Sequence, residues 1–157
     1  MYKGTFLDYF KQISNAISGY ILVQLLLSLT LWFVLHQIPK YKLFMLTSLM
    51  LSILQIGLST GYLMYYEKTK NSIIDNSEFG EEWRTHEKPR IEKLIVGYRR
   101  TISIWLILIG TLCLATLSID ILRLRHIAIA FIIQLGFTLL MDIYGKVKTD
   151  YYFQLIR

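Results

Sequence analysis

The chain has 157 residues, of which 54% are hydrophobic and 18% are charged, and its mean hydropathy is +0.45. The apolar residues gather in four blocks, so we expect a single membrane domain rather than a soluble domain with a large core. The net charge of +6 does not indicate nucleic-acid binding, because the basic residues are spread over several segments rather than forming one dense patch. Cys113 is the only cysteine, which excludes an intrachain disulfide.

Residues 2–15 carry apolar side chains at helical spacing, with Phe6, Phe10 and Ile13 on one side and polar residues on the other. We expect this segment to form a short amphipathic helix that lies on the membrane surface. The first span follows at about 16–38. It should remain uncleaved, because it is too long for the apolar part of a signal peptide and no small-residue cleavage site follows it.

The second span, at about 43–64, contains no charged residue and is long enough to cross a bilayer as a helix. Its polar residues recur at steps of four, three and four, which places them on one helical face. Lipid offers no hydrogen-bond partners for these side chains, so we expect the other spans to pack around this face. The turn at 39–42 is very short, so the first two spans must be antiparallel neighbours.

The region from about 65 to 100 mixes many charged residues with an apolar minority. The sequence at 75–77 predicts a break, with Ser77 as the N-cap of the next helix, and Pro89 predicts a second break. We therefore expect a helical hairpin outside the membrane. A short helix over about 78–87 would join extensions of the second and third spans.

The third and fourth spans are expected at about 101–122 and 127–145, again joined by a short turn. The C-terminal tail, 146–157, alternates charges with aromatic residues and is expected to extend the last helix at or just below the lipid headgroups. The predicted fold is an all-α, four-span membrane bundle formed by residues 1–157, with a helical extension between spans two and three.

The distribution of Lys and Arg predicts the orientation. Thirteen of these residues lie in the N-terminal segment, the middle connection and the C-terminal tail, whereas four lie in the two short turns. The positive-inside rule then directs both termini and the 65–100 region to the cytoplasm. We expect an integral membrane protein, with a bacterial inner membrane as its location.

Polar side chains on all four spans are expected to form a seam inside the bundle. Such residues usually serve as helix–helix contacts worth about 0.6 kcal/mol per hydrogen bond, but they can also line a hydrated path or a binding site. Asp142 is the most informative, because ionisable groups within a span are costly, although a pair with Lys146 would give it a structural role. The seam comprises Gln24, Ser48, Ser52, Gln55, Ser59, Gln134, Thr138 and Asp142.

Two groups of residues have the side-chain types found in cofactor sites. His36 and His126 have similar predicted depths and could ligate a haem, but both lie beside turns at the membrane boundary. Glu78, Glu82 and His86 recur at steps of four, yet this spacing matches neither di-iron nor zinc-protease motifs. We therefore predict no cofactor and no metal.

Three functions are compatible with the sequence. The one we favour is a homo-oligomer, surrounded by membrane lipid, that forms or gates a path for ions or small solutes. The second is a membrane-anchored adaptor that uses Phe79, Trp83 and Ile91 to contact a cytoplasmic protein, because aromatic residues often dominate interfaces. The third is an enzyme acting on lipid, quinone or haem-borne electrons, which lacks an evident cluster of titrating groups, so we lean against an enzyme.

Overall fold

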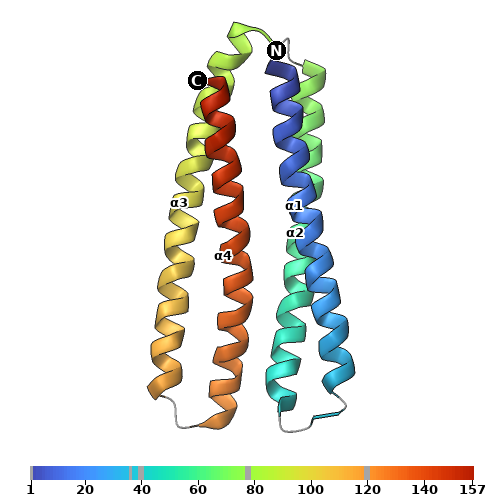
Figure 1. The fold of residues 1–157 in the computed structure, drawn as a ribbon, viewed down its shortest axis with the longest axis vertical. Coiled ribbons are helices and arrows are strands. Elements are labelled where there is room, and N and C mark those ends of the chain that lie inside the picture. Colours follow the sequence, from blue (N-terminus) through green and yellow to red (C-terminus); the bar gives the residue numbers. More distant parts are fainter. Residues whose placement is uncertain (1, 36, 39–40, 77–78, 119–120) are drawn as a thin grey trace.

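The computed structural model is a bundle of four long helices (Figure 1). The structure describes residues 2–35, 37–38, 41–76, 79–118 and 121–157. Each helix is long and apolar enough to cross a membrane, which confirms an all-α fold with four candidate spans. The helices are α1 (Tyr2–Leu35), α2 (Lys42–Asn76), α3 (Glu81–Ser118) and α4 (Leu122–Ile156).

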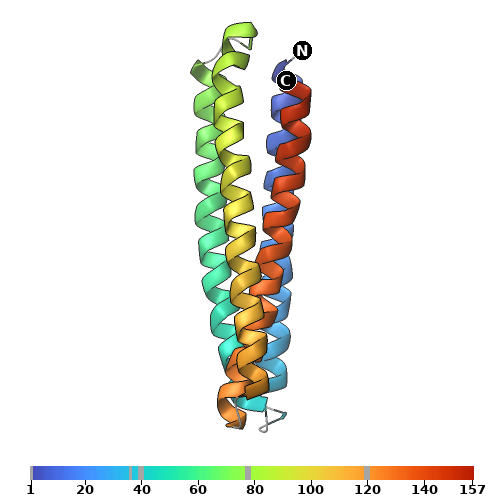
Figure 2. The ribbon, with the colours of Figure 1, turned by 90° about the vertical axis from the view of Figure 1, so that its left-hand side faces the viewer.

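The helices form two antiparallel hairpins, α1 with α2 and α3 with α4 (Figures 1 and 2). Helix α4 is central, because it also packs against α1 and α2, whereas α3 packs mainly against α4. Both chain ends and the α2–α3 connection lie at one end of the bundle, which we call the terminal end (Figure 1). The connections within the two hairpins lie at the opposite end, the turn end.

The best-packed part of the bundle lies at the terminal end, mostly beyond the expected spans. The ring of Phe10 lies between those of Phe6 and Tyr66, with centroids 4.5 Å from each, and Trp83 meets Phe6 edge-on at 5.7 Å. Such ring pairs add about 0.5–1.5 kcal/mol beyond the burial of their surface. We call this cluster the terminal core. It comprises Phe6, Tyr9, Phe10, Ile13, Ile17, Tyr66, Trp83, Ile91, Ile95, Tyr152 and Ile156.

The N-terminal segment is not a separate helix on the membrane surface. Residues 2–15 continue without interruption into the first span as α1, and the buried side chains of Phe6, Phe10 and Ile13 pack in the terminal core. The prediction was wrong because the apolar stripe of an amphipathic helix is the same whether a membrane surface or a protein core covers it.

The residues expected to form a bridging helix over 78–87 belong, from residue 81 onward, to α3 itself. Helix α3 continues through Pro89, although an interior proline removes a hydrogen bond and usually costs about 3 kcal/mol. Trp83 before this proline and Ile91 after it are both buried in the terminal core. The predicted break at Pro89 was therefore wrong, since packing on both sides of the proline offsets its local preference.

All four helices build the part of the molecule beyond the spans, rather than α2 and α3 alone. The predicted break after α2 is confirmed, because that helix ends at Asn76, but Ser77 lies outside the described residues. The C-terminal tail does extend α4, and Tyr152 and Ile156 are buried in the terminal core rather than lying among lipid headgroups. The terminal end is thus a four-helix bundle, not a projecting hairpin.

Five polar side chains at the terminal end form a network of hydrogen bonds and one ring stack: Glu87, Arg90, Tyr152, Tyr9 and Thr149. The carboxylate of Glu87, only 4% exposed, accepts hydrogen bonds from Arg90 Nε at 2.7 Å and from the Tyr152 hydroxyl at 3.2 Å. Burial and the Glu87 carboxylate raise the pKa of Tyr152, so its hydroxyl stays protonated and donates. The ring of Tyr9 stacks on Tyr152 at 4.3 Å, and its hydroxyl shares a 3.0 Å hydrogen bond with Thr149. This network joins α1, α3 and α4.

Replacing a ring of the terminal core should destabilise the whole bundle. We expect Phe10→Ala to lower the free energy of unfolding by about 3–5 kcal/mol, because it leaves a cavity among packed rings. The measurement is reversible unfolding of the detergent-solubilised protein by a denaturing detergent. The control is Phe33→Ala on the same helix, where the side chain is 70% exposed and the loss should stay below about 1 kcal/mol. Equal losses would contradict the assignment of the core to the terminal end.

Candidate functional site

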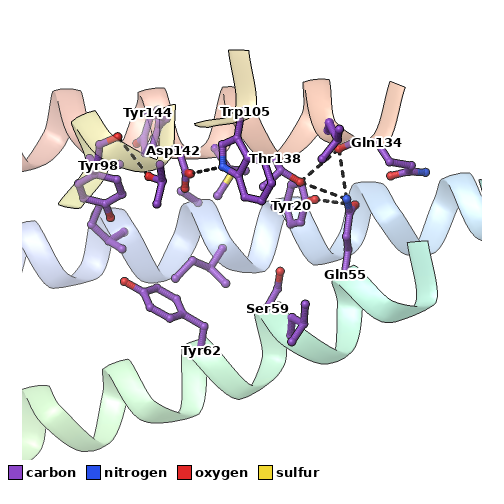
Figure 3. A pocket seen from close by; sticks show the side chains of 18 of the residues that line it. Tyr20, Gln55, Ser59, Tyr62, Tyr98, Trp105, Gln134, Thr138, Asp142 and Tyr144 are labelled. Atoms are coloured by element: carbon purple, nitrogen blue, oxygen red, sulfur yellow. Dashed lines mark hydrogen bonds between the residues drawn. The ribbon is translucent and has the colours of Figure 1, made fainter. Parts of the chain in front are cut away.

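A cavity of about 710 Å³ lies between α2 and α3 and is backed by α1 and α4; it extends from the expected spans toward the terminal end (Figure 3). It exists because α2 and α3 make few direct contacts, whereas α4 closes against the other three helices. Most of its wall is apolar. The aliphatic and phenylalanine side chains lining it include Leu51, Leu54, Leu58, Leu94, Phe131 and Leu135.

A glycine on α4 allows α3 to approach at one edge of this cavity. A Cβ atom added to Gly145 would lie 2.7 Å from the Tyr98 hydroxyl oxygen and 2.9 Å from two ring carbons. Only a residue without a side chain leaves room for the Tyr98 ring in this position. Both residues line the cavity, so this close approach shapes the wall that α3 and α4 form together.

Gln55 joins three helices across one side of the cavity (Figure 3). Its side-chain oxygen accepts a 2.7 Å hydrogen bond from the Tyr20 hydroxyl of α1. Its amide nitrogen donates to the Thr138 hydroxyl and to the Gln134 backbone carbonyl of α4, both at 3.1 Å. Hydrogen bonds between Gln55, Tyr20 and α4 therefore hold the polar part of the wall in place.

A second glutamine lies deeper, between α2 and α4. The amide nitrogen of Gln134 donates to the Ser52 hydroxyl at 2.8 Å and, at 3.4 Å, to the backbone carbonyl of Ser48. Since Tyr20 bonds to Gln55, antiparallel pairing of α1 and α2 brings Gln24 to the level of Ser52 one turn further. A compact polar layer thus crosses the bundle core.

Several buried polar atoms in this layer have no hydrogen-bond partner among the described residues. They are the amide nitrogen and oxygen of Gln24, the hydroxyls of Ser28 and Ser48, and the side-chain oxygen of Gln134. Buried polar groups without protein partners commonly bind ordered water.

Asp142 lies on the cavity wall, where its carboxylate accepts a 2.7 Å hydrogen bond from the indole nitrogen of Trp105 (Figure 3). Lys146, the structural partner considered for it, instead pairs with Asp150 on the following turn. Within the described part of the chain, Asp142 forms no ion pair. An ionisable group in a span without a counter-ion is costly and usually marks a functional site.

Aromatic residues from three helices share the cavity with this carboxylate. Trp105 donates a hydrogen bond to it, and Tyr20, Tyr62 and Tyr98 lie on other parts of the cavity wall (Figure 3). The cavity therefore combines apolar walls with one acidic, aromatic corner.

The structure brings most of the predicted seam into or behind this cavity. The seam residues that line it are Gln55, Ser59, Gln134, Thr138 and Asp142. The others, Gln24, Ser48 and Ser52, are buried in the polar layer behind it. Whether any of these residues lines a hydrated path stays a prediction.

The sequence analysis missed the aromatic members of the site, because it gave no site role to Tyr20, Tyr62, Tyr98 or Trp105. Aromatic residues near the ends of spans are also selected by the membrane interface, so their types alone do not reveal a cavity. The sequence shows which residues share a face of each helix, but it does not show how far α3 is shifted along α4. Without that register, Tyr98 and Trp105 could not be placed next to the polar residues of α4.

The residues predicted to contact a cytoplasmic partner lie in and around the terminal core. Trp83 and Ile91 are 7% and 0% exposed, and the half-buried Phe79 lies 5.3 Å from Phe6 between ring centroids. Other helices of the same chain cover these side chains in this structure. Binding of a partner through them stays an untested prediction.

The residues considered as cofactor ligands are only partly visible. His36 and Glu78 lie outside the described residues, His126 is half-buried at the start of α4, and Glu82 and His86 are exposed on α3. Among residues that the structure describes, no group of three or more His, Cys, Asp and Glu side chains is arranged to hold a metal ion.

No known protein family, curated protein or solved structure matches this chain. The chemistry of the site therefore follows from its own geometry. It can receive an apolar body along its walls and offer hydrogen bonds and a negative charge at one corner.

The contact between Gly145 and Tyr98 can be tested with paired glycine substitutions. We expect Gly145→Ala to lower the free energy of unfolding by about 1–3 kcal/mol, because its methyl group would overlap the Tyr98 ring. The loss should largely vanish in a Tyr98→Ala background, as measured by a double-mutant cycle in detergent. The control is Gly136→Ala on the same helix, where nothing lies within 4 Å. Similar losses at both glycines, without coupling to Tyr98, would reject this contact.

Proposed function

We propose that the protein binds a small amphipathic molecule, which enters the cavity between α2 and α3 from the bilayer. The observation that carries this proposal is a cavity of about 710 Å³ with apolar walls and hydrogen-bonding groups gathered on one side. Sites for small molecules commonly measure about 300–1,000 Å³, and a few polar groups in a mostly apolar lining orient the ligand. The volume and lining therefore fit a ligand about the size of a drug molecule.

Entry from the lipid phase is supported by the loose packing of α3. None of the residues in the most apolar window of α3 is buried, and this helix packs mainly against α4. The side of the cavity between α2 and α3 can thus open without breaking a packed interface. A molecule dissolved among acyl chains would reach the polar corner without crossing the terminal core.

The proposal also includes an orientation. The excess of Lys and Arg at the terminal end supports a cytoplasmic location for both termini in a bacterial inner membrane. The terminal core then lies in water, where burial of its rings holds the two hairpins together. In this arrangement the bilayer half of the molecule binds the ligand, and the cytoplasmic half maintains the bundle.

A second candidate is a homo-oligomer that forms or gates a path for ions or small solutes. It is supported by the buried side-chain atoms of Gln24, Ser28, Ser48 and Gln134 that have no partner among the described residues. Water at these atoms would extend the polar layer, and the unburied face of α3 would offer a surface to a second copy.

Conductance measurements in planar bilayers test the second candidate. If the polar layer carries ions, the wild-type protein should conduct, and Gln55→Leu and Asp142→Asn should each reduce the current, because both substitutions remove polar groups from the predicted seam. The control is Leu114→Ala, a lipid-facing position on α3 that is 69% exposed. Absence of current in the wild-type protein would eliminate the path and leave the binding proposal intact.

Occupancy of the cavity can be followed through Trp105. The chain has three tryptophans, so Trp32→Phe combined with Trp83→Phe leaves Trp105 alone. Addition of ω-bromohexanol to this variant in lipid nanodiscs should quench its fluorescence saturably, because bromine quenches an indole that it contacts.

Two matched glycine substitutions on α3 provide the control. Gly97→Phe puts a ring into the cavity and should remove the saturable quenching, whereas Gly110→Phe lies outside the lining and should preserve it. Quenching that never saturates, or that is the same in all three proteins, would reject a bound state and indicate only partition into lipid.

A further inference from the structure

The charge balance of the cavity identifies the class of ligand. We infer that the ligand carries an organic ammonium group, which the carboxylate of Asp142 and the surrounding aromatic rings receive, while its apolar body lies along the cavity walls. This inference rests on the proposed function and makes it more specific.

The first argument is that Asp142 lacks a positive partner. Among the described residues it is the only acidic one that lines the cavity, and its hydrogen bond from Trp105 occupies a single carboxylate oxygen. Lys93 is the only basic residue among those described in the lining, and it forms no ion pair with Asp142. A charge without a counter-ion is costly in a mostly apolar cavity, so a cationic ligand would compensate it.

The second argument is the type of side chain around the carboxylate. Tyr20, Tyr62 and Tyr98 line the same cavity as Asp142 from α1, α2 and α3, and Trp105 donates a hydrogen bond to the carboxylate. The faces of aromatic rings attract ammonium groups, and several rings around one site are a known way of binding methylated ammonium ions. A carboxylate in a cavity lined by aromatic rings thus favours an alkylated ammonium ion over a bare inorganic cation.

The same features disfavour other ligand classes. An inorganic cation such as Ca²⁺ takes six to eight oxygen ligands, whereas Asp142 is the only carboxylate that lines this cavity. A carboxylate or phosphate ligand would be repelled by Asp142. A neutral alcohol would satisfy hydrogen bonds near Gln55 and Thr138 but would leave the charge of Asp142 uncompensated.

The experiment compares three probes that share an ω-bromohexyl chain and end in trimethylammonium, hydroxyl or carboxylate. Binding is measured by saturable quenching of Trp105 in the Trp32→Phe, Trp83→Phe protein, reconstituted in phosphatidylcholine nanodiscs. We expect the ammonium probe to bind about tenfold more tightly than the alcohol, and the carboxylate to bind most weakly.

Substitution of Asp142 distinguishes recognition of the ammonium charge by the protein from partition of the probe into lipid. Asp142→Asn keeps an oxygen that can accept the Trp105 hydrogen bond, and it should weaken binding of the ammonium probe about tenfold while changing the alcohol less than about twofold. The matched control is Asp75→Asn, which removes an exposed carboxylate near the end of α2 and should change neither value.

The aromatic contribution has its own pair of variants. Tyr62→Leu should weaken binding of the ammonium probe severalfold, whereas Tyr62→Phe, which keeps the ring, should retain most of the affinity. Equal loss in both variants would contradict recognition by the ring face.

The outcomes distinguish this inference from the function on which it rests. Saturable binding of the ammonium and the alcohol with equal affinity, unaffected by Asp142→Asn, would overturn the ammonium assignment while the binding cavity stands. No saturable quenching by any probe would overturn both.

A repeat in phosphatidylglycerol nanodiscs identifies the source of the ammonium group. If Asp142→Asn weakens binding of the ammonium probe more in phosphatidylglycerol than in phosphatidylcholine, choline headgroups compete with the probe for the site. If the effect of the substitution is equal in the two lipids, the ligand is a free amphiphile.

Discussion

The structure depends on the stacking of rings from all four helices at the terminal end of the bundle. In the proposed arrangement this end lies in water, where burial of Phe6, Phe10, Tyr66 and Trp83 removes apolar surface from the solvent and so stabilises the contacts between the helices. Inside the membrane that driving force is absent, because acyl chains are as apolar as leucine side chains. The spans are therefore held by a few interhelical hydrogen bonds, and α3 can stand apart from α2 without exposing the terminal core.

This division between two halves explains why the cavity lies where it does. Gln55 fastens α1, α2 and α4 to one another, whereas α2 and α3 make few direct contacts, among them an interaction between the hydroxyls of Tyr62 and Tyr98. Asp142 then faces a space that protein atoms leave open, with Trp105 as its hydrogen-bond donor. A firm scaffold at the terminal end permits a loosely closed, chemically distinct site directly beside it.

The fold was largely accessible from sequence, and the site only in part. Candidate spans followed from the length of uncharged segments. Ser52 and Gln55, which their spacing places on one helical face, are buried and half-buried in the structure. The roles of residues 2–15 and of Pro89 were misjudged, since an apolar stripe does not state what covers it and local preferences ignore tertiary packing. The cavity was not foreseeable, because it arises from the spacing between α2 and α3, and the pattern of one helix carries no information on its distance from the next.

The position of the terminal core has a mechanical consequence. Each helix is a rod about 50 Å long, and the four rods are joined most firmly near one tip. A change of about 5° in the angle between the two hairpins would move the opposite tips by about 4 Å and the middle of the bundle by about half as much. A small rearrangement of the stacked rings in the terminal core would thus widen the gap between the two hairpins at the level of the cavity. A change at the terminal end would then alter how easily a molecule enters the cavity.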